Sequence, residues 1–373
     1  MINWAKGYSA QFYLQVVDPS TWRDVGTVDI TDGSIKREPT GQRESADVGC
    51  VNYHIPVEQW VRIYMDVRQA GGDAEHVPLF TGLATSPEDT VKSASVINKI
   101  ECYSVLKPAA DVFLQVGWYA VAGRRGGDVI ADLLSVSPAP VYVQADSPTL
   151  TETIIAEEGE TNLSMVDRIL DAMNWRMRID GDGTINIIPK PVDTVAVLDP
   201  ISNDVIESSS TIVKTPTYAC PNVLMAESGS AVGIARDDDP LSPLSTVSRG
   251  REVWARESGV TLIGGESINE YASRRLMELQ NVQKSASYTR RYIPSVFPGD
   301  LIEIHYPQES LKGTYKIESQ TVTLGYNAKT SEDVVTDVRV EAEREREVAV
   351  FYLVDNGRNN IVTADGDRII FIA

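Results

Sequence analysis

The sequence predicts an α+β protein, mainly β, in which two β-rich segments flank a small α/β domain. Three observations point to this fold. Both ends of the chain are rich in short runs of β-branched and aromatic residues that stop at Gly, Pro or Asp turns. Residues 108–198 instead carry apolar residues at helical spacing. A chain of 373 residues is also too long for one compact core, so two to three domains are expected.

The first predicted barrel-like domain covers residues 1–107. Its clearest strand is the run 61–68, in which every second residue is apolar and shares one face: Val61, Ile63, Met65 and Val67. Further runs of strand length, each followed by a turn signal or a break, cover residues 12–17, 28–30, 50–55, 79–83 and 95–106. This spacing is typical of a small barrel or sandwich.

The inserted α/β domain is predicted over residues 108–198. One helix is expected at 129–134. A second helix carries a clearer apolar stripe, made by Leu163, Val166, Ile169, Leu170 and Met173. Two strand runs, 175–179 and 184–188, flank the turn Asp180-Gly181-Asp182-Gly183, which predicts a β-hairpin.

The second barrel-like domain is predicted over residues 199–345, with one helix at 268–282. Ser267 and Glu270 have the spacing of a capping box, which marks the start of this helix. The loop 237–248 is rich in Asp, Pro and Ser, and is expected to be mobile or to contact a partner.

The unit after this helix is the most informative part of the chain. Phe297-Pro298-Gly299-Asp300 is a turn signal that leads into a strand over 301–304, and Lys312-Gly313 is a second turn before more strand. No catalytic group is concentrated in this unit. A helix followed by paired strands therefore indicates a structural or assembly protein.

A C-terminal β-hairpin arm is predicted over residues 346–373. Its strand runs, 348–354 and 368–372, keep the chain apolar almost to its last residue. Because an exposed apolar strand promotes aggregation, the arm needs cover from the chain's own body or from a neighbour. The mixed-charge run 341–347 is predicted to be a solvated connector.

Composition excludes several classes of protein. The net charge of −19 argues against specific nucleic-acid binding, because phosphate contacts need Lys and Arg. An acidic protein surface that repels phosphate would still let nucleic acid pass along it. No run of 18 apolar residues occurs, so stable membrane insertion is not expected. Cys50, Cys102 and Cys220 are odd in number and far apart, which predicts free thiols in a reducing cytoplasm.

No catalytic, cofactor-binding or metal site is predicted. His54, His76 and His305 lie in separate β segments without ligand spacing. The turn at 180–183 resembles the start of a calcium loop, but strand follows where further ligands are needed, so a plain hairpin is favoured. The Gly-Arg-Arg-Gly-Gly loop at 123–127 precedes a helix and lacks P-loop spacing, so a flexible basic loop is favoured over an anion site.

Two other classes of function stay open. The chain has 53 carboxylates, so a pair suited to the hydrolysis of a glycan or of peptidoglycan is conceivable. A carbohydrate-binding module would instead use exposed aromatic rings, for which Trp118, Tyr119 and Trp254 are the candidates.

Four stretches taken in order resemble a known family. They are the opening β segment with the runs 28–35 and 79–83, the passage from 102–106 into the helix at 127–134, the segment 158–175 with the hairpin that ends at Pro189, and the Pro-Gly-Asp unit. In this order the chain resembles the baseplate hub, or tail-hub, proteins of tailed bacteriophages, which are related in fold to the hub part of type VI secretion spikes. The resemblance covers most of residues 10–345.

The resemblance implies a structural protein of the virion, at the tail tip or baseplate, assembled in the host cytoplasm. It implies two β-barrel-like domains of similar topology with the α/β domain inserted between them. It also implies a homotrimer, in which six barrels form a pseudo-sixfold ring below the tail tube. Expected partners are a distal tail or tail-tube protein, a tape-measure protein, and a fibre, spike or receptor-binding protein, with DNA passing through the lumen. The chain departs from some relatives in having no lysozyme or peptidase domain. No enzymatic activity and no cofactor are therefore expected.

Overall fold

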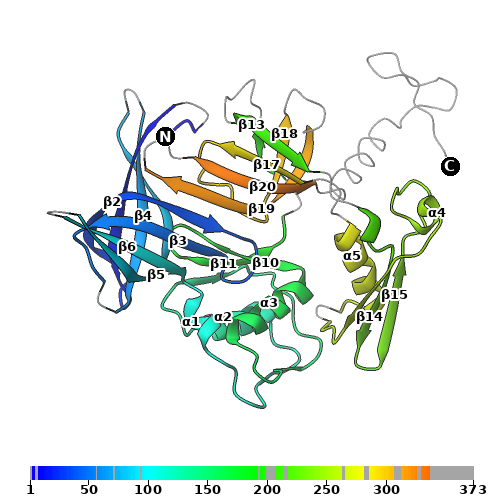
Figure 1. The fold of residues 1–373 in the computed structure, drawn as a ribbon. Coiled ribbons are helices and arrows are strands. Elements are labelled where there is room, and N and C mark those ends of the chain that lie inside the picture. The colour runs from blue at the N-terminus through cyan, green and yellow to red at the C-terminus, as the bar shows by residue number, and fades with distance from the viewer. Residues whose placement is uncertain are drawn as a thin grey trace, which may run out of the picture.

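A computed structural model describes most of the chain, and it is mainly β (Figure 1). The described residues are 2–4, 7–55, 57–69, 72–92, 95–191, 194–198, 206–213, 217–262, 265–280, 285–305, 312–325 and 329–336. The predicted C-terminal arm at 346–373 and the connector at 341–347 lie outside them.

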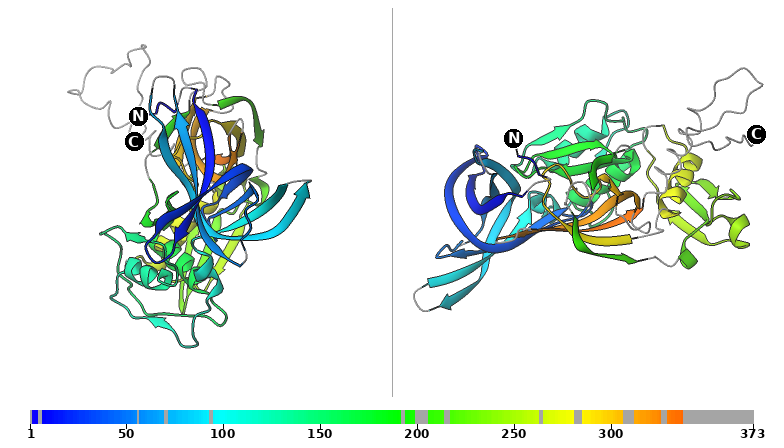
Figure 2. Two further views of the ribbon diagram at one scale, coloured as in Figure 1. Left: turned by 90° about the vertical axis from the view of Figure 1, so that its left-hand side faces the viewer. Right: turned by 90° about the horizontal axis from the view of Figure 1, so that it is seen from above.

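The first barrel is a closed ring of antiparallel strands. They are β1 (Ser9–Asp18), β2 (Arg23–Arg37), β3 (Glu44–Val51), β4 (Gln59–Arg68), β5 (Glu75–Lys92) and β6 (Ser95–Ser104). Their order is β1-β4-β5-β6-β3-β2, and the β1–β2 pairing closes the ring, which is seen from above in Figure 2. The predicted inner face is confirmed, because Val61, Ile63, Met65 and Val67 are all fully buried.

The α/β domain follows the first barrel and packs around its own core. Its helices are α1 (Lys107–Asp111), α2 (Gly126–Leu134) and α3 (Asn162–Met173), and its strands are β7 (Tyr119–Ala120), β8 (Val141–Val143), β9 (Ile154–Ile155), β10 (Trp175–Ile179) and β11 (Ile185–Pro189). The apolar stripe of α3 is buried with the inner face of the β10–β11 hairpin. Thr161 caps α3, and Asn174 ends it in the left-handed conformation that Asn tolerates. The predicted helices and hairpin are confirmed.

The second barrel repeats the strand order of the first. Its strands are β12 (Thr194–Leu198), β13 (Ile206–Val213), β17 (Ser285–Arg290), β18 (Leu301–His305), β19 (Lys312–Leu324) and β20 (Thr330–Thr336). Their order is β12-β18-β19-β20-β17-β13. When the six strands of each barrel are numbered by their order along the chain, both barrels have the same order in the sheet: first, fourth, fifth, sixth, third and second. The predicted similarity in topology is confirmed in this order.

Two pairings differ between the two barrels. β1 pairs with β2 and closes the first ring, whereas no pairing joins β12 to β13 among the described residues. β1 runs antiparallel to β4, whereas β12 runs parallel to β18. β12 also lies within the range 108–198 that was predicted as the α/β domain, yet it pairs with the second barrel. A run of five residues carries no sign of its partner strand, so this pairing is visible only in the structure.

A second α/β unit is inserted between β13 and β17. It contains the 3-10 helix η1 (Thr217–Ala219), β14 (Val223–Ser228), β15 (Ala231–Arg236), α4 (Thr246–Arg249), β16 (Trp254–Ser258) and α5 (Ile268–Gln280). The sheet order is β15-β14-β16, and α5 covers one face of it. The predicted capping box is confirmed: Ser267 N donates to Glu270 Oε2 at 2.7 Å, and Glu270 N donates to Ser267 Oγ at 3.3 Å.

This unit lies inside the range 199–345 that was predicted as one barrel-like domain with one helix. The short helix α4 was not predicted. In the loop 237–248, Ser242 Oγ donates to Asp237 Oδ2 at 2.7 Å, and Thr246 N donates to the carbonyl of Asp237 at 2.8 Å. The division of the chain into domains stays a prediction.

A strand pairing joins the two barrels into one sheet. β2 pairs antiparallel with β19, from Arg37 opposite Gln320 to Gly33 opposite Leu324. Residues nearly 300 positions apart thus become neighbours, as the adjacent blue and orange arrows of Figure 1 show. Within the described residues, no helix is long and apolar enough to cross a membrane.

Candidate functional site

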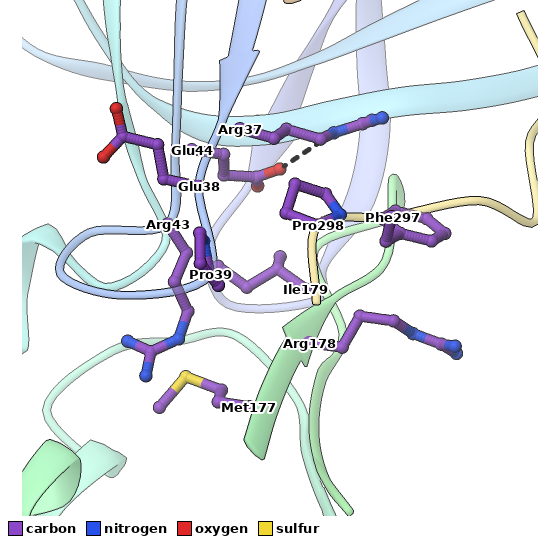
Figure 3. Close-up of a pocket in the computed structure, with 10 residues that line it drawn as sticks. All are labelled: Arg37, Glu38, Pro39, Arg43, Glu44, Met177, Arg178, Ile179, Phe297 and Pro298. Atoms are coloured by element: carbon purple, nitrogen blue, oxygen red, sulfur yellow. Dashed lines mark ion pairs between the residues drawn. The ribbon is translucent and has the colours of Figure 1, made fainter. Parts of the chain in front are cut away.

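The first barrel, the α/β domain and the second barrel meet at one place, which we call the three-way junction (Figure 3). Its small cavity has room for roughly one water molecule. The first barrel contributes the β2–β3 corner, the α/β domain contributes β10, and the second barrel contributes the turn before β18. The lining residues are Arg37, Glu38, Pro39, Arg43, Glu44, Met177, Arg178, Ile179, Phe297 and Pro298.

The turn at 180–183 inserts into the first barrel. The Gly181 carbonyl accepts a hydrogen bond of 2.8 Å from Thr81 Oγ1, and the Asp182 carbonyl accepts one of 3.0 Å from Arg62 Nη2. A Cβ on Gly181 would lie 2.0 Å from the Pro78 carbonyl oxygen, so only glycine allows this approach. The predicted hairpin is confirmed, and its glycines serve a docking contact that the sequence analysis did not predict.

The Pro-Gly-Asp turn holds the α/β domain against the second barrel. Gly299 has φ +83°, in the left-handed region that glycine adopts without strain. Asp300 Oδ2 accepts a hydrogen bond of 2.9 Å from Phe297 N, which fixes the turn. Asp300 Oδ1 lies 2.6 Å from Arg176 Nη2 of β10, as an ion pair without hydrogen-bond alignment. Sequence reasoning predicted the turn but not this partner, which comes from another domain.

Phe297 lies between two guanidinium groups. The guanidinium carbon of Arg37 is 5.0 Å from the ring centroid, and that of Arg178 is 5.3 Å from it. Both distances are within the range of cation–π attraction. Arg37 comes from the first barrel and Arg178 from the α/β domain, so this ring contacts both of the other units.

A buried polar network extends along the β2–β19 joint. Arg37 Nη1 donates to Gln320 Oε1 at 2.7 Å, and Gln320 Nε2 donates to Glu332 Oε1 at 2.8 Å. Glu332 Oε2 also accepts from Arg290 Nε at 2.8 Å and from the Tyr288 hydroxyl at 2.6 Å. All five side chains belong to residues that are at most 3% exposed. Burial, together with the nearby carboxylate of Glu332, raises the pKa of the Tyr288 hydroxyl well above its ordinary value.

Glu44 is the least compensated charge at the junction. Its carboxylate lies 3.8 Å from Arg37 Nε, beyond hydrogen-bond distance, and its residue is 5% exposed. Burial raises the pKa of Glu44 to about 8, although Arg37 lowers it and Asp180 raises it further. Taking a carboxylate out of water disfavours its charged form, and a partner at this distance offsets only part of that cost.

The three histidines do not come together. His76 Nδ1 lies 2.6 Å from Asp66 Oδ1, and His305 Nε2 lies 2.7 Å from Glu303 Oε1, while His54 is exposed elsewhere in the first barrel. Among the described residues, no group of three or more His, Cys, Asp or Glu side chains is placed to hold a metal ion. Each pair is more simply a local contact within one sheet.

The cysteines are free thiols, as predicted. Burial is the main cause that raises the pKa of Cys50 to about 12, and burial likewise raises the pKa values of Cys102 and Cys220. A thiol with a raised pKa holds little thiolate at neutral pH and is a poor nucleophile.

The basic loop at 123–127 contacts the helix that follows it. Arg124 Nη2 lies 2.6 Å from Asp132 Oδ2, and Arg125 Nη1 lies 3.7 Å from Asp128 Oδ1. Both arginines are therefore paired with carboxylates of α2.

The candidate aromatic residues lie in two different units. Trp118 packs against the core of the α/β domain, while Tyr119 beside it is 60% exposed. Trp254 on β16 is 53% exposed, and its indole Nε1 donates to Glu252 Oε2 at 2.8 Å. The structure therefore brings none of these rings to the three-way junction.

Comparison with solved structures identifies the fold. The 43 kDa tail protein of prophage MuSo2 from Shewanella oneidensis is similar, with a TM-score of 0.64 and 13% identity, over 88% of this chain and 98% of that one. The tail protein from Neisseria meningitidis gives a TM-score of 0.63 and 13% identity, over 89% and 97%. The chain has the fold of phage tail proteins. An Escherichia coli component of the type VI secretion system is also similar, with a TM-score of 0.50 and 9% identity over 87% of this chain and 76% of that one.

The resemblance predicted from the sequence is thus confirmed at the level of the fold. No family model matches the sequence, and no curated protein matches it. The likeness to phage tail proteins is carried by strand order and packing rather than by shared residues, because identity is only 13%.

Proposed function

We propose that this protein is a structural hub of a bacteriophage tail, located at the tail tip or baseplate, without enzymatic activity. In this proposal three copies form a ring that joins the tail tube to receptor-binding or tail-tip components. One observation carries it: two barrels with the same strand order are joined side by side through β2 and β19. Three such chains contribute six similar barrels, which is the number that a sixfold tube above them requires.

The chemistry of the junctions supports a mechanical role. Buried polar contacts join the units: Arg176 pairs with Asp300 between the α/β domain and the second barrel, and Arg37 donates to Gln320 between the two barrels. Gln320 in turn donates to Glu332 within the second barrel. Such contacts hold units in register. The similar structures are named as tail proteins, which agrees with a structural part of a virion.

The acidic balance supports a lumen through which DNA passes. Three chains of net charge −19 carry 3 × −19, or about −57, charges. A surface of this sign repels phosphate and offers it no binding site. Proposed neighbours are a distal tail or tail-tube protein, a tape-measure protein, and a fibre, spike or receptor-binding protein.

Two measurements test the hub. Light scattering of the pure protein is expected to give the mass of three 40.9 kDa chains. Electron microscopy of particles labelled with an antibody to the protein is expected to place the label at the distal end of the tail. A stable monomer, together with particles that carry no label, would overturn the proposal.

The absence of enzymatic activity has its own test. Glycan, peptidoglycan and ester substrates are expected to survive incubation with the pure protein. Turnover that disappears when a single buried carboxylate is replaced would show that the protein is a hydrolase.

We further propose that residues 346–373 contact a fibre, spike or neighbouring subunit. The support is their apolar sequence, which needs cover. Deletion of 351–373 is expected to weaken tail assembly while both barrels still fold, as measured by particle yield and circular dichroism. Unchanged assembly and solubility would show that this segment is dispensable.

A further inference from the structure

The second α/β unit buries only one face of its sheet. Ala272 and Leu276 of α5 pack with Leu224 and Ala226 of β14 in a common core. In Figure 1 and Figure 2, α5 lies on the side of the sheet that is turned toward the barrels. The opposite side, which we call the outer face, therefore points away from the rest of the described chain.

Large apolar side chains of β15 lie exposed on the outer face. A Cβ on Gly233 would lie 2.5 Å from the carbonyl oxygen of Ile268 in α5, so Gly233 faces the helix. Its neighbours Val232 and Ile234 point the other way, because side chains alternate along a strand, and both residues are 54% exposed.

The other two strands extend this apolar surface. Ala255 of β16 packs against the core under α5, so Trp254 and Arg256 point to the outer face. Met225 of β14 lies between β15 and Arg256 in the register of the sheet. Arg256 Nη2 lies 2.9 Å from Glu227 Oε2, so a second layer can cover this surface without burying an unpaired charge. The apolar stripe of the outer face consists of Val232, Ile234, Met225 and Trp254.

The C-terminal arm contains two apolar runs whose lengths fit this sheet. The runs 348–354 and 368–372 have seven and five residues. β14 and β15 have six residues each, and β16 has five. Apart from Arg368, neither run alternates with charged residues. A strand that reads as a continuous apolar run is typically covered on both faces.

The arm is long enough to reach the outer face of its own chain. β20 ends at Thr336, on the side of the second barrel that faces the second α/β unit (Figure 1). The eleven residues 337–347 can extend over about 36 Å. A helix packed on a sheet is roughly 20 Å thick. Attachment to the same chain also gives the arm a local concentration of about millimolar at this face, which favours it over a free partner.

We propose that residues 348–372 form a second β layer on the outer face of their own chain's second α/β unit. One apolar face of the arm packs on the stripe, as two sheets pack in a sandwich. The other apolar face remains for the fibre, spike or neighbouring subunit. This second contact rests on the proposed function, whereas the docking of the arm on its own sheet does not.

The reactivity of a thiol on the outer face tests the docking. The variant is Val232→Cys in a Cys220→Ser background, because Cys220 is the one native thiol of the three that is not buried. If the arm covers the stripe nine-tenths of the time, a maleimide reacts about tenfold more slowly with the full chain than with a chain that ends at Glu347. The matched control is Val25→Cys, at a strand valine that is 64% exposed in the first barrel, which is expected to react equally in both chains. Equal rates for Val232→Cys in the two chains overturn the proposal.

Full-length variants test the two faces of the arm separately. Ile370→Ser with Ile372→Ser changes one face of the last run, and Ile369→Ser with Phe371→Ser changes the other, because side chains alternate. One pair is expected to raise the reaction rate of Val232→Cys to that of the shortened chain. The other pair is expected to leave this rate low and to reduce particle yield. Equal reaction rates in the two pairs overturn the two-faced arrangement.

Photocrosslinking identifies what covers the stripe. Trp254→p-benzoylphenylalanine places a photoreactive ring on the outer face, and isotopically heavy and light chains are assembled together before irradiation. Crosslinks from this position are expected to reach residues 346–373 of the same isotopic chain. Crosslinks to the other isotopic chain, or to a segment outside the arm, overturn the proposal.

The outcomes separate the docking from the proposed function. An unprotected Val232→Cys thiol, together with a loss of particle yield on deletion of the arm, overturns the docking and leaves the contact with a tail partner intact. A protected thiol, together with normal particle yield in both pairs of serine variants, supports the docking and overturns the contact with a tail partner.

Discussion

Arg176 of β10 and Asp300 of the Pro-Gly-Asp turn form an ion pair with 2.6 Å between Nη2 and Oδ1, and the Asp300 side chain is only 1% exposed. This contact ties the α/β domain to the second barrel across 124 positions of sequence. When the partner of a buried carboxylate is removed, the free-energy cost of taking the carboxylate out of water remains, but the attraction of the opposite charge that offset it is lost.

Replacing Arg176 with Leu is therefore expected to lower the free energy of unfolding by about 3–5 kcal/mol at neutral pH. Urea unfolding followed by circular dichroism measures it. The matched control is Arg256→Leu, which removes an exposed partner of Glu227 and is expected to leave the free energy of unfolding nearly unchanged, because water screens an exposed ion pair. Equal losses in both variants would show that the Arg176–Asp300 pair holds nothing together.

Glu44 is expected to make stability depend on pH. Its pKa is about 8 in the folded protein against an ordinary value of 4.5, so between these pH values the folded state holds a proton that the unfolded chain releases. The free energy of unfolding should then fall as pH rises through this window, by at most about 1.4 kcal/mol per pH unit. The stability that comes from the proton held by Glu44 in the folded state is fully present below pH 4.5 and is lost above about pH 8.

Glu44→Gln is expected to flatten this dependence, because the amide does not titrate. Unfolding in urea at several pH values from 5 to 9 measures the slope. Glu38→Gln is the control, since Glu38 lines the same cavity but is exposed. The idea fails if the slope is unchanged in Glu44→Gln, or if Glu38→Gln flattens it equally.

Gly181→Ala is expected to weaken the docking of the α/β domain on the first barrel. The new Cβ would meet the Pro78 carbonyl oxygen at 2.0 Å, a contact with backbone that cannot rotate away. Overpacking of this kind costs about 1–3 kcal/mol. Since Trp22 Nε1 donates to the Asp182 carbonyl at 3.1 Å, tryptophan fluorescence should report the separation at urea concentrations where the wild type stays docked. Gly7→Ala is the control, because nothing lies within 4 Å of its Cβ position. A Gly181→Ala protein that unfolds like the control would refute the docking role.

The sequence predicted this fold well where the signal is local. The period-two face of residues 61–68, the apolar stripe of α3 and the Ser267–Glu270 cap each depend on residues within a few positions of one another, and each is confirmed. The likeness of the two barrels was also predicted, from the order of segments.

What the sequence could not predict depends on partners far along the chain. Nothing near Arg37 indicates that its guanidinium contacts Gln320, and nothing in the five residues of β12 indicates that they pair with β18 instead of joining the α/β domain. The second α/β unit was missed for a related reason, since its short strands resemble those of the barrel that surrounds them. The glycines of the turn at 180–183 were explained by the hairpin alone, and their close approach to Pro78 became visible only in three dimensions.

Arg290 and Glu332 provide the last prediction, because both are fully buried and each neutralises the other. Arg290 Nε donates to Glu332 Oε2 at 2.8 Å, and the same carboxylate accepts from Tyr288 and Gln320. Arg290→Met leaves a buried negative charge, and Glu332→Gln leaves a buried positive charge while it keeps an acceptor for the Tyr288 hydroxyl. Each single variant is expected to lose about 3–5 kcal/mol of unfolding free energy.

The double variant Arg290→Met/Glu332→Gln buries no unpaired charge at this site. It is therefore expected to lose less than the sum of the two single losses, with a coupling energy on the order of 1–3 kcal/mol in a double-mutant cycle measured by urea unfolding. Additive losses would mean that the two charges do not stabilise each other, and that the network along the β2–β19 joint is held by its neutral hydrogen bonds instead.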